Sequence, residues 1–166
     1  MMMAFLIAFV VFVALLYLAR RRSHRSSSPL GVEGKILYAD QGRKSKLFIN
    51  RKYGITAKPD FIITTPNGEN VMVEYKSRTG RVYQSDIVQL LASVLAARSE
   101  MPIHRAIVVT RGTRREVELG SDEHIFRRIS KFVLLARRAQ KGEIIKIFSS
   151  HPGVCRTCSV AHSCQR

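Results

Sequence analysis

Residues 60–76, with the sequence DFIITTPNGENVMVEYK, contain the clearest strand–turn–strand pattern in the chain. Residues 61–65 (FIITT) and 71–75 (VMVEY) are rich in β-branched and apolar side chains, and Pro66, Asn67 and Gly68 supply a turn between them. The pattern predicts an antiparallel hairpin centred on Asn67, in which residues whose numbers sum to about 134 face each other.

Two acidic residues occupy facing positions of this hairpin. By that register Asp60 lies opposite Glu74, and directly opposed residues have Cβ atoms about 4.5–5.5 Å apart. Two such carboxylates repel each other, and a divalent cation such as Mg²⁺ or Mn²⁺, which takes oxygen ligands, removes the conflict. Lys76 follows Glu74 by two residues, so strand alternation places both side chains on one face. The alternative interpretation is a surface hairpin with ordinary solvated charges.

These three residues supply what hydrolysis of a phosphodiester requires. A metal ion polarises the phosphoryl group and lowers the pKa of a bound water, while a neighbouring cation stabilises developing negative charge. We therefore assign Asp60 and Glu74 as metal ligands, and we expect Lys76 to orient the attacking water or to hold the phosphate.

The flanking sequence predicts further strands and two helices. An apolar face of Ile87, Leu90, Leu91, Val94 and Leu95 indicates a helix over residues 84–98, and Ser121 is a suitable N-cap for a second helix. The predicted strands are residues 35–38, 46–49, 103–110, 114–119 and 143–148, with a turn at residues 40–42. This order predicts an α/β or α+β domain with a small mixed sheet flanked by helices.

The N-terminal segment has the composition of a membrane anchor. The first 19 residues carry no charge, and about 20 apolar residues in a helix cross a hydrocarbon core of about 30 Å. The basic residues from Arg20 to Arg25 follow directly, so the positive-inside tendency places the rest of the chain in the cytoplasm. A cleaved signal peptide is the alternative, but it would need positive charge before the apolar run and a small-residue cleavage site after it. We predict a single-pass anchor at residues 1–20 in the inner membrane and a basic flexible linker at residues 21–30.

The net charge of the chain is +16, which points to a polyanionic partner. Nucleic acid and the anionic headgroups of the inner leaflet both fit this charge. Charge alone indicates binding, not cutting, and it predicts no oligomeric state.

Pro59 and Asp60, followed by Glu74, Tyr75 and Lys76, match the signature of the PD-(D/E)xK nucleases, with 13 residues between the acids. The longer pattern RKYGITAKPDFII…VEYKS…QSDIVQL resembles the RecB-like nucleases, and it is most similar to the CRISPR-associated exonuclease family and its stand-alone relatives. The resemblance covers residues 31–164. It implies a restriction-endonuclease-like core within a nuclease domain at residues 31–150, dependence on Mg²⁺ or Mn²⁺, and DNA as the substrate. The predicted set of Mg²⁺ or Mn²⁺ ligands is Asp60, Glu74 and Tyr75.

The predicted helix over residues 84–98 keeps part of a motif of the RecB-like family. The family has a Gln-x-x-x-Tyr motif on the helix after the catalytic strand; Gln89 matches the glutamine, but Ser93 stands in place of the tyrosine. Asp86, Gln89 and Ser93 form one polar stripe, which faces either solvent or the cleft, where Gln89 would contact DNA or the Lys76 region. We include Gln89 among the catalytic residues. The family also has an upstream ligand, for which Glu33 and Asp40 are the two candidates.

The three cysteines lie within the last 12 residues, at Cys155, Cys158 and Cys164. Their spacing, together with His151, is typical of metal ligation and not of a disulfide framework. The resemblance implies a 4Fe–4S cluster whose fourth ligand is an N-terminal cysteine that this chain lacks, and a Cys₃His site for Zn²⁺ is the alternative. The fourth ligand is then His151, His162 or His24, unless the thiols are unligated. We predict a cysteine-rich tail at residues 151–166.

Three functions are consistent with these patterns. The first is a membrane-anchored, metal-dependent DNA nuclease, most similar to a RecB-like exonuclease. The second is a catalytically weak module that tethers DNA at the membrane, and the third is a resolvase or a restriction-like endonuclease. The intact acids and lysine favour the enzyme. Cutting at ends or in the interior, either strand polarity, and roles in CRISPR adaptation, repair or antiviral defence all fit the sequence.

Overall fold

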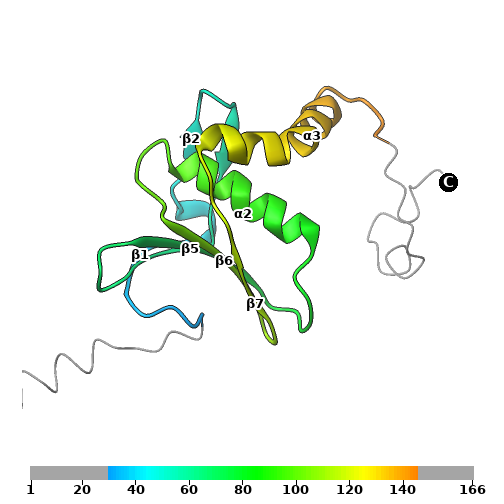
Figure 1. Cartoon of the computed structure of the whole chain (residues 1–166). Coiled ribbons are helices and arrows are strands. Elements are labelled where there is room, and N and C mark those ends of the chain that lie inside the picture. The colour runs from blue at the N-terminus through cyan, green and yellow to red at the C-terminus, as the bar shows by residue number, and fades with distance from the viewer. Residues whose placement is uncertain (1–29, 146–166) are drawn as a thin grey trace, which may run out of the picture. The chain divides into compact units, whose positions relative to one another are not determined.

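The computed structural model describes residues 30–145 (Figure 1). The chain divides into two compact units, one ending at Ile129 and one beginning at Ser130. The strands are β1 (Lys35–Ala39), β2 (Phe48–Asn50), β3 (Ile55–Ala57), β4 (Phe61–Thr64), β5 (Asn70–Lys76), β6 (Arg105–Thr110) and β7 (Arg114–Val117). The helices are the short 3-10 helix η1 (Gly42–Lys44), α2 (Gln84–Ala97) and α3 (Asp122–Gln140).

The larger sheet has five strands in the order β1-β4-β5-β6-β7. The central pair, β5 and β6, is parallel, and the other neighbours are antiparallel. Parallel strands need a crossover connection, and α2 supplies it between β5 and β6 (Figure 1). The sheet is therefore mixed and helix-covered, which fits a restriction-endonuclease-like core and confirms the predicted α/β class.

One face of this sheet packs against α2. Met72 and Ala106 point to this side of β5 and β6 and are fully buried. All five apolar residues predicted for the inner face of the helix are at most 4% exposed. The 3.6-residue spacing of these side chains placed them on one side of a helix, and their burial confirms that interpretation.

The other face of the sheet carries a second apolar cluster. Leu30 and Val32, which precede β1, pack on Ile63, Val71, Val73, Ile107 and Val109. Gly34 lets this N-terminal segment run close to β4, because a Cβ there would lie 2.3 Å from the carbonyl oxygen of Thr64. Strand β5 is thus covered on both faces, and its end emerges from a rigid core.

A separate two-stranded sheet forms where the sequence predicts only one strand. Strand β2 pairs with β3, a three-residue strand that sequence patterns did not predict, and β1 pairs with β4 instead. The turn at residues 40–42 is present, with the Gly42 N–H donating a 2.9 Å hydrogen bond to Asp40 Oδ1, and it continues into η1. A three-residue strand is too short for its side chains to show the alternation that identifies strands in sequence.

The second predicted helix is α3, and its start agrees with the prediction. The His124 N–H donates to Ser121 Oγ at 3.2 Å, so Ser121 caps the helix. Ile125 and Ile129 in the first half of α3 are fully buried, whereas Ala136 in its second half is exposed. Of the predicted strand at residues 143–148, residues 143–145 have no regular structure and the remainder lies outside the described part of the chain.

Three predictions fall on residues that the structure does not describe. They are the anchor at residues 1–20, most of the linker at residues 21–30 and the cysteine tail at residues 151–166. Within residues 30–145, no helix is both long and apolar enough to cross a membrane.

Candidate active site

The two strands β4 and β5 have the register predicted from the sequence. Phe61 pairs with Val73, and Ile62 pairs with Met72. Asp60 stands directly before β4, and its Oδ2 accepts a 2.8 Å hydrogen bond from the backbone N–H of Tyr75. The side chain of Asp60 is therefore fixed against β5, between the positions of Glu74 and Lys76.

Glu74 is a carboxylate inside the core. It lies on the α2 side of β5 and is 1% exposed. Burial raises the pKa of Glu74 to about 7, and the negative charges of Asp60 and Asp86 add to this rise. The hydrogen bond and the charge of Lys76 act in the opposite direction. A further positive charge beside Glu74 would stabilise its ionised carboxylate.

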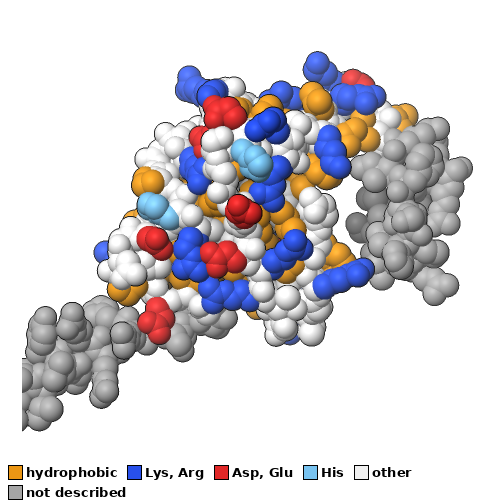
Figure 2. Space-filling view, viewed as in Figure 1, with side chains coloured by type: hydrophobic (Ala, Val, Ile, Leu, Met, Phe, Trp, Pro, Cys, Tyr) orange, Lys and Arg blue, Asp and Glu red, His pale blue; other side chains and the backbone are white. Residues whose placement is uncertain are grey.

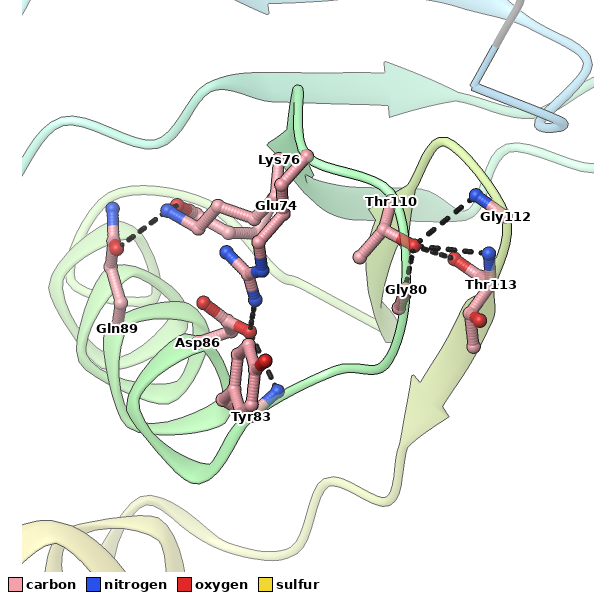
Figure 3. Close-up of polar contacts among 10 residues, drawn as sticks. Glu74, Lys76, Gly80, Tyr83, Asp86, Gln89, Thr110, Gly112 and Thr113 are labelled. Carbon is pink, nitrogen blue, oxygen red and sulfur yellow. Dashed lines mark hydrogen bonds and ion pairs between the residues drawn. The ribbon is translucent and has the colours of Figure 1, made fainter. Parts of the chain in front are cut away.

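The side chain of Lys76 forms hydrogen bonds to residues of both β5 and α2. Its Nζ donates to Glu74 Oε1 at 2.7 Å and to Gln89 Oε1 at 2.8 Å (Figure 3). The first contact follows from strand alternation, and the second brings in a side chain from the second turn of α2. An ammonium has three N–H donors, so one of them has no partner among the described residues. This donor is available to a bound water or a phosphate oxygen.

The polar stripe of α2 is buried at both ends and exposed in the middle, at Gln89. Asp86 is 4% exposed and Ser93 is 2% exposed, while Gln89 between them reaches Lys76. Gln89 thus reaches the Lys76 region, as one of the two predicted orientations requires, while its side chain stays accessible to solvent. Ser93 lies too deep for a side chain of its size to reach a bound strand.

A shallow hollow opens beside Asp60. Asp40, Asp60, Phe61 and Tyr75 line it. The backbone N–H of Asp40 donates a 2.9 Å hydrogen bond to the carbonyl oxygen of Asp60, which holds the ends of β1 and β4 together. Of the two upstream acids suggested by the sequence, Asp40 is thus the one beside Asp60, and Glu33 does not line the hollow.

The donor set of this site fits a hard divalent cation. Asp60 and Glu74 repel each other electrostatically, and a cation bound between them would relieve that repulsion. Within residues 30–145, no group of three or more His, Cys, Asp or Glu side chains is close enough to enclose an ion. Mg²⁺ is commonly held by one or two carboxylates, with water and substrate phosphate completing its shell. The two carboxylates Asp60 and Glu74 are compatible with such a site, and the ligand set of Asp60, Glu74 and Tyr75 stays a prediction.

The sequence patterns missed an ion pair that holds the loop next to this site. Arg78 Nη2 donates to Asp86 Oδ2, and the same oxygen accepts a 2.7 Å hydrogen bond from the Tyr83 N–H. An acid three residues after a helix N-cap is a recognisable capping signal, which could have identified the second contact. No local pattern marks Arg78, because its partner lies eight residues away across a loop.

The predicted structural metal or iron–sulfur ligands, His151, Cys155, Cys158 and Cys164, lie outside the described residues, as do His24 and His162. Their arrangement is therefore not part of the candidate site.

A mixed α/β core thus carries two acids, a lysine and a glutamine at one end of its sheet, an arrangement that fits metal-dependent cleavage of phosphodiesters. A family model described as the PD-(D/E)XK nuclease superfamily matches residues 8–165. The chain therefore belongs to the PD-(D/E)XK nuclease superfamily, as its motif suggested. No curated protein matches it in sequence.

Proposed function

We propose that this protein is a Mg²⁺- or Mn²⁺-dependent DNA nuclease, similar to the RecB-like exonucleases and, among these, to the CRISPR-associated exonuclease family and its stand-alone relatives. The observation that carries the proposal is the position of Lys76 Nζ, 2.7 Å from the buried Glu74 and 2.8 Å from Gln89. Glu74 and Gln89 together hold the Lys76 ammonium in one orientation, as a lysine that acts on a phosphate or a water requires.

The residues of the site divide the work of hydrolysis. Asp60 and Glu74, with Tyr75, would hold the metal ion, which supplies Lewis acidity and lowers the pKa of a bound water. Lys76 directs its remaining N–H at the phosphate or the attacking water and stabilises negative charge that develops there. Gln89 and Glu74 together keep that ammonium in place before substrate arrives, so little reorganisation is needed during the reaction.

The charge of the protein supports DNA as the substrate. The net charge is +16, and Figure 2 shows Lys and Arg side chains spread over the face in view, with fewer Asp and Glu among them. Contacts from these side chains to phosphates add affinity without reading sequence. We therefore expect binding that weakens steeply with salt and shows little sequence preference.

The proposal includes attachment to the cytoplasmic face of the inner membrane. It is supported by the uncharged first 19 residues and by the basic residues that follow them. It also includes a 4Fe–4S cluster, or alternatively Zn²⁺, bound by Cys155, Cys158, Cys164 and a histidine such as His151. An absorption band at about 400 nm in anaerobically purified protein would identify the cluster. One equivalent of bound zinc without that band would identify the Zn²⁺ site.

Cleavage of linear and circular DNA tests the proposed activity. The full chain in mild detergent is incubated with end-labelled linear and with circular single- and double-stranded DNA, with Mn²⁺ or with EDTA. We expect Mn²⁺-dependent loss of linear DNA and persistence of the circles, and no activity for Glu74→Ala. Glu118→Ala, which changes an exposed acid outside the site, should remain active. Binding without cleavage by the wild type would replace the nuclease with a DNA-tethering module, and cutting of circles would replace the exonuclease with an endonuclease.

A further inference from the structure

The loop between β5 and α2, residues 77–83, is fastened to the sheet at two points. Thr110 Oγ1 donates a 2.7 Å hydrogen bond to the carbonyl oxygen of Gly80 (Figure 3). The Arg111 N–H donates a 3.1 Å hydrogen bond to the carbonyl oxygen of Arg78. Thr110 is 5% exposed, so the first of these contacts is shielded from water. A loop held by buried hydrogen bonds presents its side chains in a fixed arrangement.

The same loop is fastened to α2 by Asp86. The carboxylate of Asp86, which is 4% exposed, accepts hydrogen bonds from the Tyr83 N–H and from Arg78 Nη2. Asp86 is also close enough to Glu74 for its charge to act on that acid. The loop and the candidate cutting centre are therefore neighbours, and Figure 3 shows Tyr83 and Asp86 beside Glu74, Lys76 and Gln89.

An exposed aromatic ring stands at the end of this loop and is contacted by two arginines. Tyr83 is 46% exposed, and the guanidinium carbons of Arg78 and Arg81 lie 4.7 and 5.3 Å from its ring centroid. Arg78 is anchored by Asp86. Arg81 is exposed, and the ring is its one contact within the described residues. Arg81 can therefore leave the ring at small cost, while Arg78 stays.

We propose that Tyr83, Arg78 and Arg81 form a binding site for one unpaired nucleotide beside the cutting centre. The base stacks on the Tyr83 ring in the place of Arg81, and the guanidinium of Arg81 contacts a backbone phosphate. This combination of an aromatic platform and mobile cations is how proteins bind single strands without reading sequence. A paired base is already stacked within the duplex, so the ring selects single-stranded segments and frayed ends. The inference rests on the proposed nuclease function and specifies its substrate.

Equilibrium binding without cleavage tests this site. Fluorescence anisotropy of labelled oligo-dT and of a duplex of equal length is measured in EDTA, with the full chain in mild detergent. Tyr83→Ala should weaken single-strand binding by about tenfold, the size of one lost base stack, and should change duplex binding by less than about twofold. Tyr83→Phe keeps the ring and should bind as the wild type does. Ile49→Ala, which truncates a side chain of similar exposure on β2, should have no effect.

Arg81→Ala provides a second variant, on an exposed side chain whose loss should leave the fold intact. It should reduce the slope of log affinity against log salt for oligo-dT by about one ion, because one phosphate contact is lost. Unchanged oligo-dT binding by Tyr83→Ala, or equal losses on single strand and duplex, would overturn the site.

The proposed activity and the proposed site can fail separately. Wild-type protein that cleaves DNA with Mn²⁺ but shows no dependence of binding on Tyr83 retains the nuclease and loses the nucleotide site. Wild-type protein that binds through Tyr83 but does not cleave retains the nucleotide site and loses the nuclease.

Discussion

The backbone N–H of Tyr75 donates a 2.8 Å hydrogen bond to Asp60 Oδ2, which joins the acid before β4 to the strand that carries Glu74 and Lys76. The contact uses one carboxylate oxygen for the fold and leaves the other for a ligand. Asp60 therefore has a structural role and a proposed chemical role, and the two can be separated by substitution.

Asp60→Asn separates these roles. The amide oxygen still accepts the Tyr75 N–H, so the midpoint of thermal unfolding should stay within about 3 °C of the wild type. The loss of charge should weaken Mn²⁺ binding by at least about tenfold, measured by isothermal titration calorimetry. Asp60→Ala should lose both properties. Mn²⁺ affinity that is equal in Asp60→Asn and the wild type would remove Asp60 from the ligand set.

The raised pKa of Glu74 makes the stability of the metal-free protein depend on pH. The folded state holds this proton more tightly than the unfolded chain, because the pKa rises from 4.5 to about 7 on folding. The free energy of unfolding should therefore fall as the pH rises through this window, by up to about 3 kcal/mol, and should level off above it. Denaturant titrations in EDTA between pH 4.5 and 8 measure this slope.

Glu74→Gln should flatten that pH profile, since it removes the titrating group. Glu118→Gln, which alters an exposed acid, should keep the wild-type slope. Mn²⁺ should restore stability at pH 8 in the wild type but not in Glu74→Gln, because the ion binds the folded, ionised form. A wild-type profile that is already flat would show that Glu74 titrates normally.

Gln89→Ala tests whether this glutamine of α2 positions Lys76. The ammonium should lose one of its two contacts and move, which should lower kcat by up to about a hundredfold. KM for DNA should change little, because Gln89 is expected to act through Lys76. Gln84→Ala, at the exposed first residue of α2, is the matched control. If KM for DNA rose while kcat stayed at the wild-type value, Gln89 would contact DNA instead of positioning Lys76.

Asn50 connects the small sheet to α2 and should be important for stability. It is 6% exposed, and its Nδ2 donates a 2.7 Å hydrogen bond to the carbonyl oxygen of Leu95. Asn50→Ala leaves that buried carbonyl without its donor, so the free energy of unfolding should fall by about 1–3 kcal/mol. Asn67→Ala in the exposed β4–β5 turn should cost less than about 0.5 kcal/mol. Urea denaturation measures both, and equal effects would contradict a specific role for Asn50.

The register of β4 and β5 could be predicted because local chemistry determines it. The turn at residues 66–68 sets which positions face each other, and strand alternation then sets which side chains share a face. The helix α2 was predictable for a similar reason, because its apolar residues recur every three or four positions, as they do on one face of a helix. The hairpin register alone predicts that Asp60, Glu74 and Lys76 lie together, whereas the helix pattern left Gln89 facing either solvent or the cleft.

Features made by contacts between distant segments could not be predicted from the sequence. The pairing of β2 with β3 depends on a three-residue strand, and the fastening of Gly80 depends on Thr110, 30 residues further along the chain. The burial of Glu74 depends on the position in which α2 crosses the sheet. No local pattern carries this information, which is why the raised pKa of Glu74 and the arrangement of the loop at residues 77–83 emerge only in the folded structure.

We infer that Lys76, held by Glu74 and Gln89, acts in the chemical step of the proposed reaction. The most direct test of this inference is the single-turnover cleavage rate of Lys76→Met with saturating protein and Mn²⁺, compared with Lys35→Met on the exposed end of β1. The structure predicts that Lys76→Met binds DNA but cleaves it about 10²–10³-fold more slowly, whereas Lys35→Met matches the wild type. Equal single-turnover rates for Lys76→Met and the wild type would contradict the assignment.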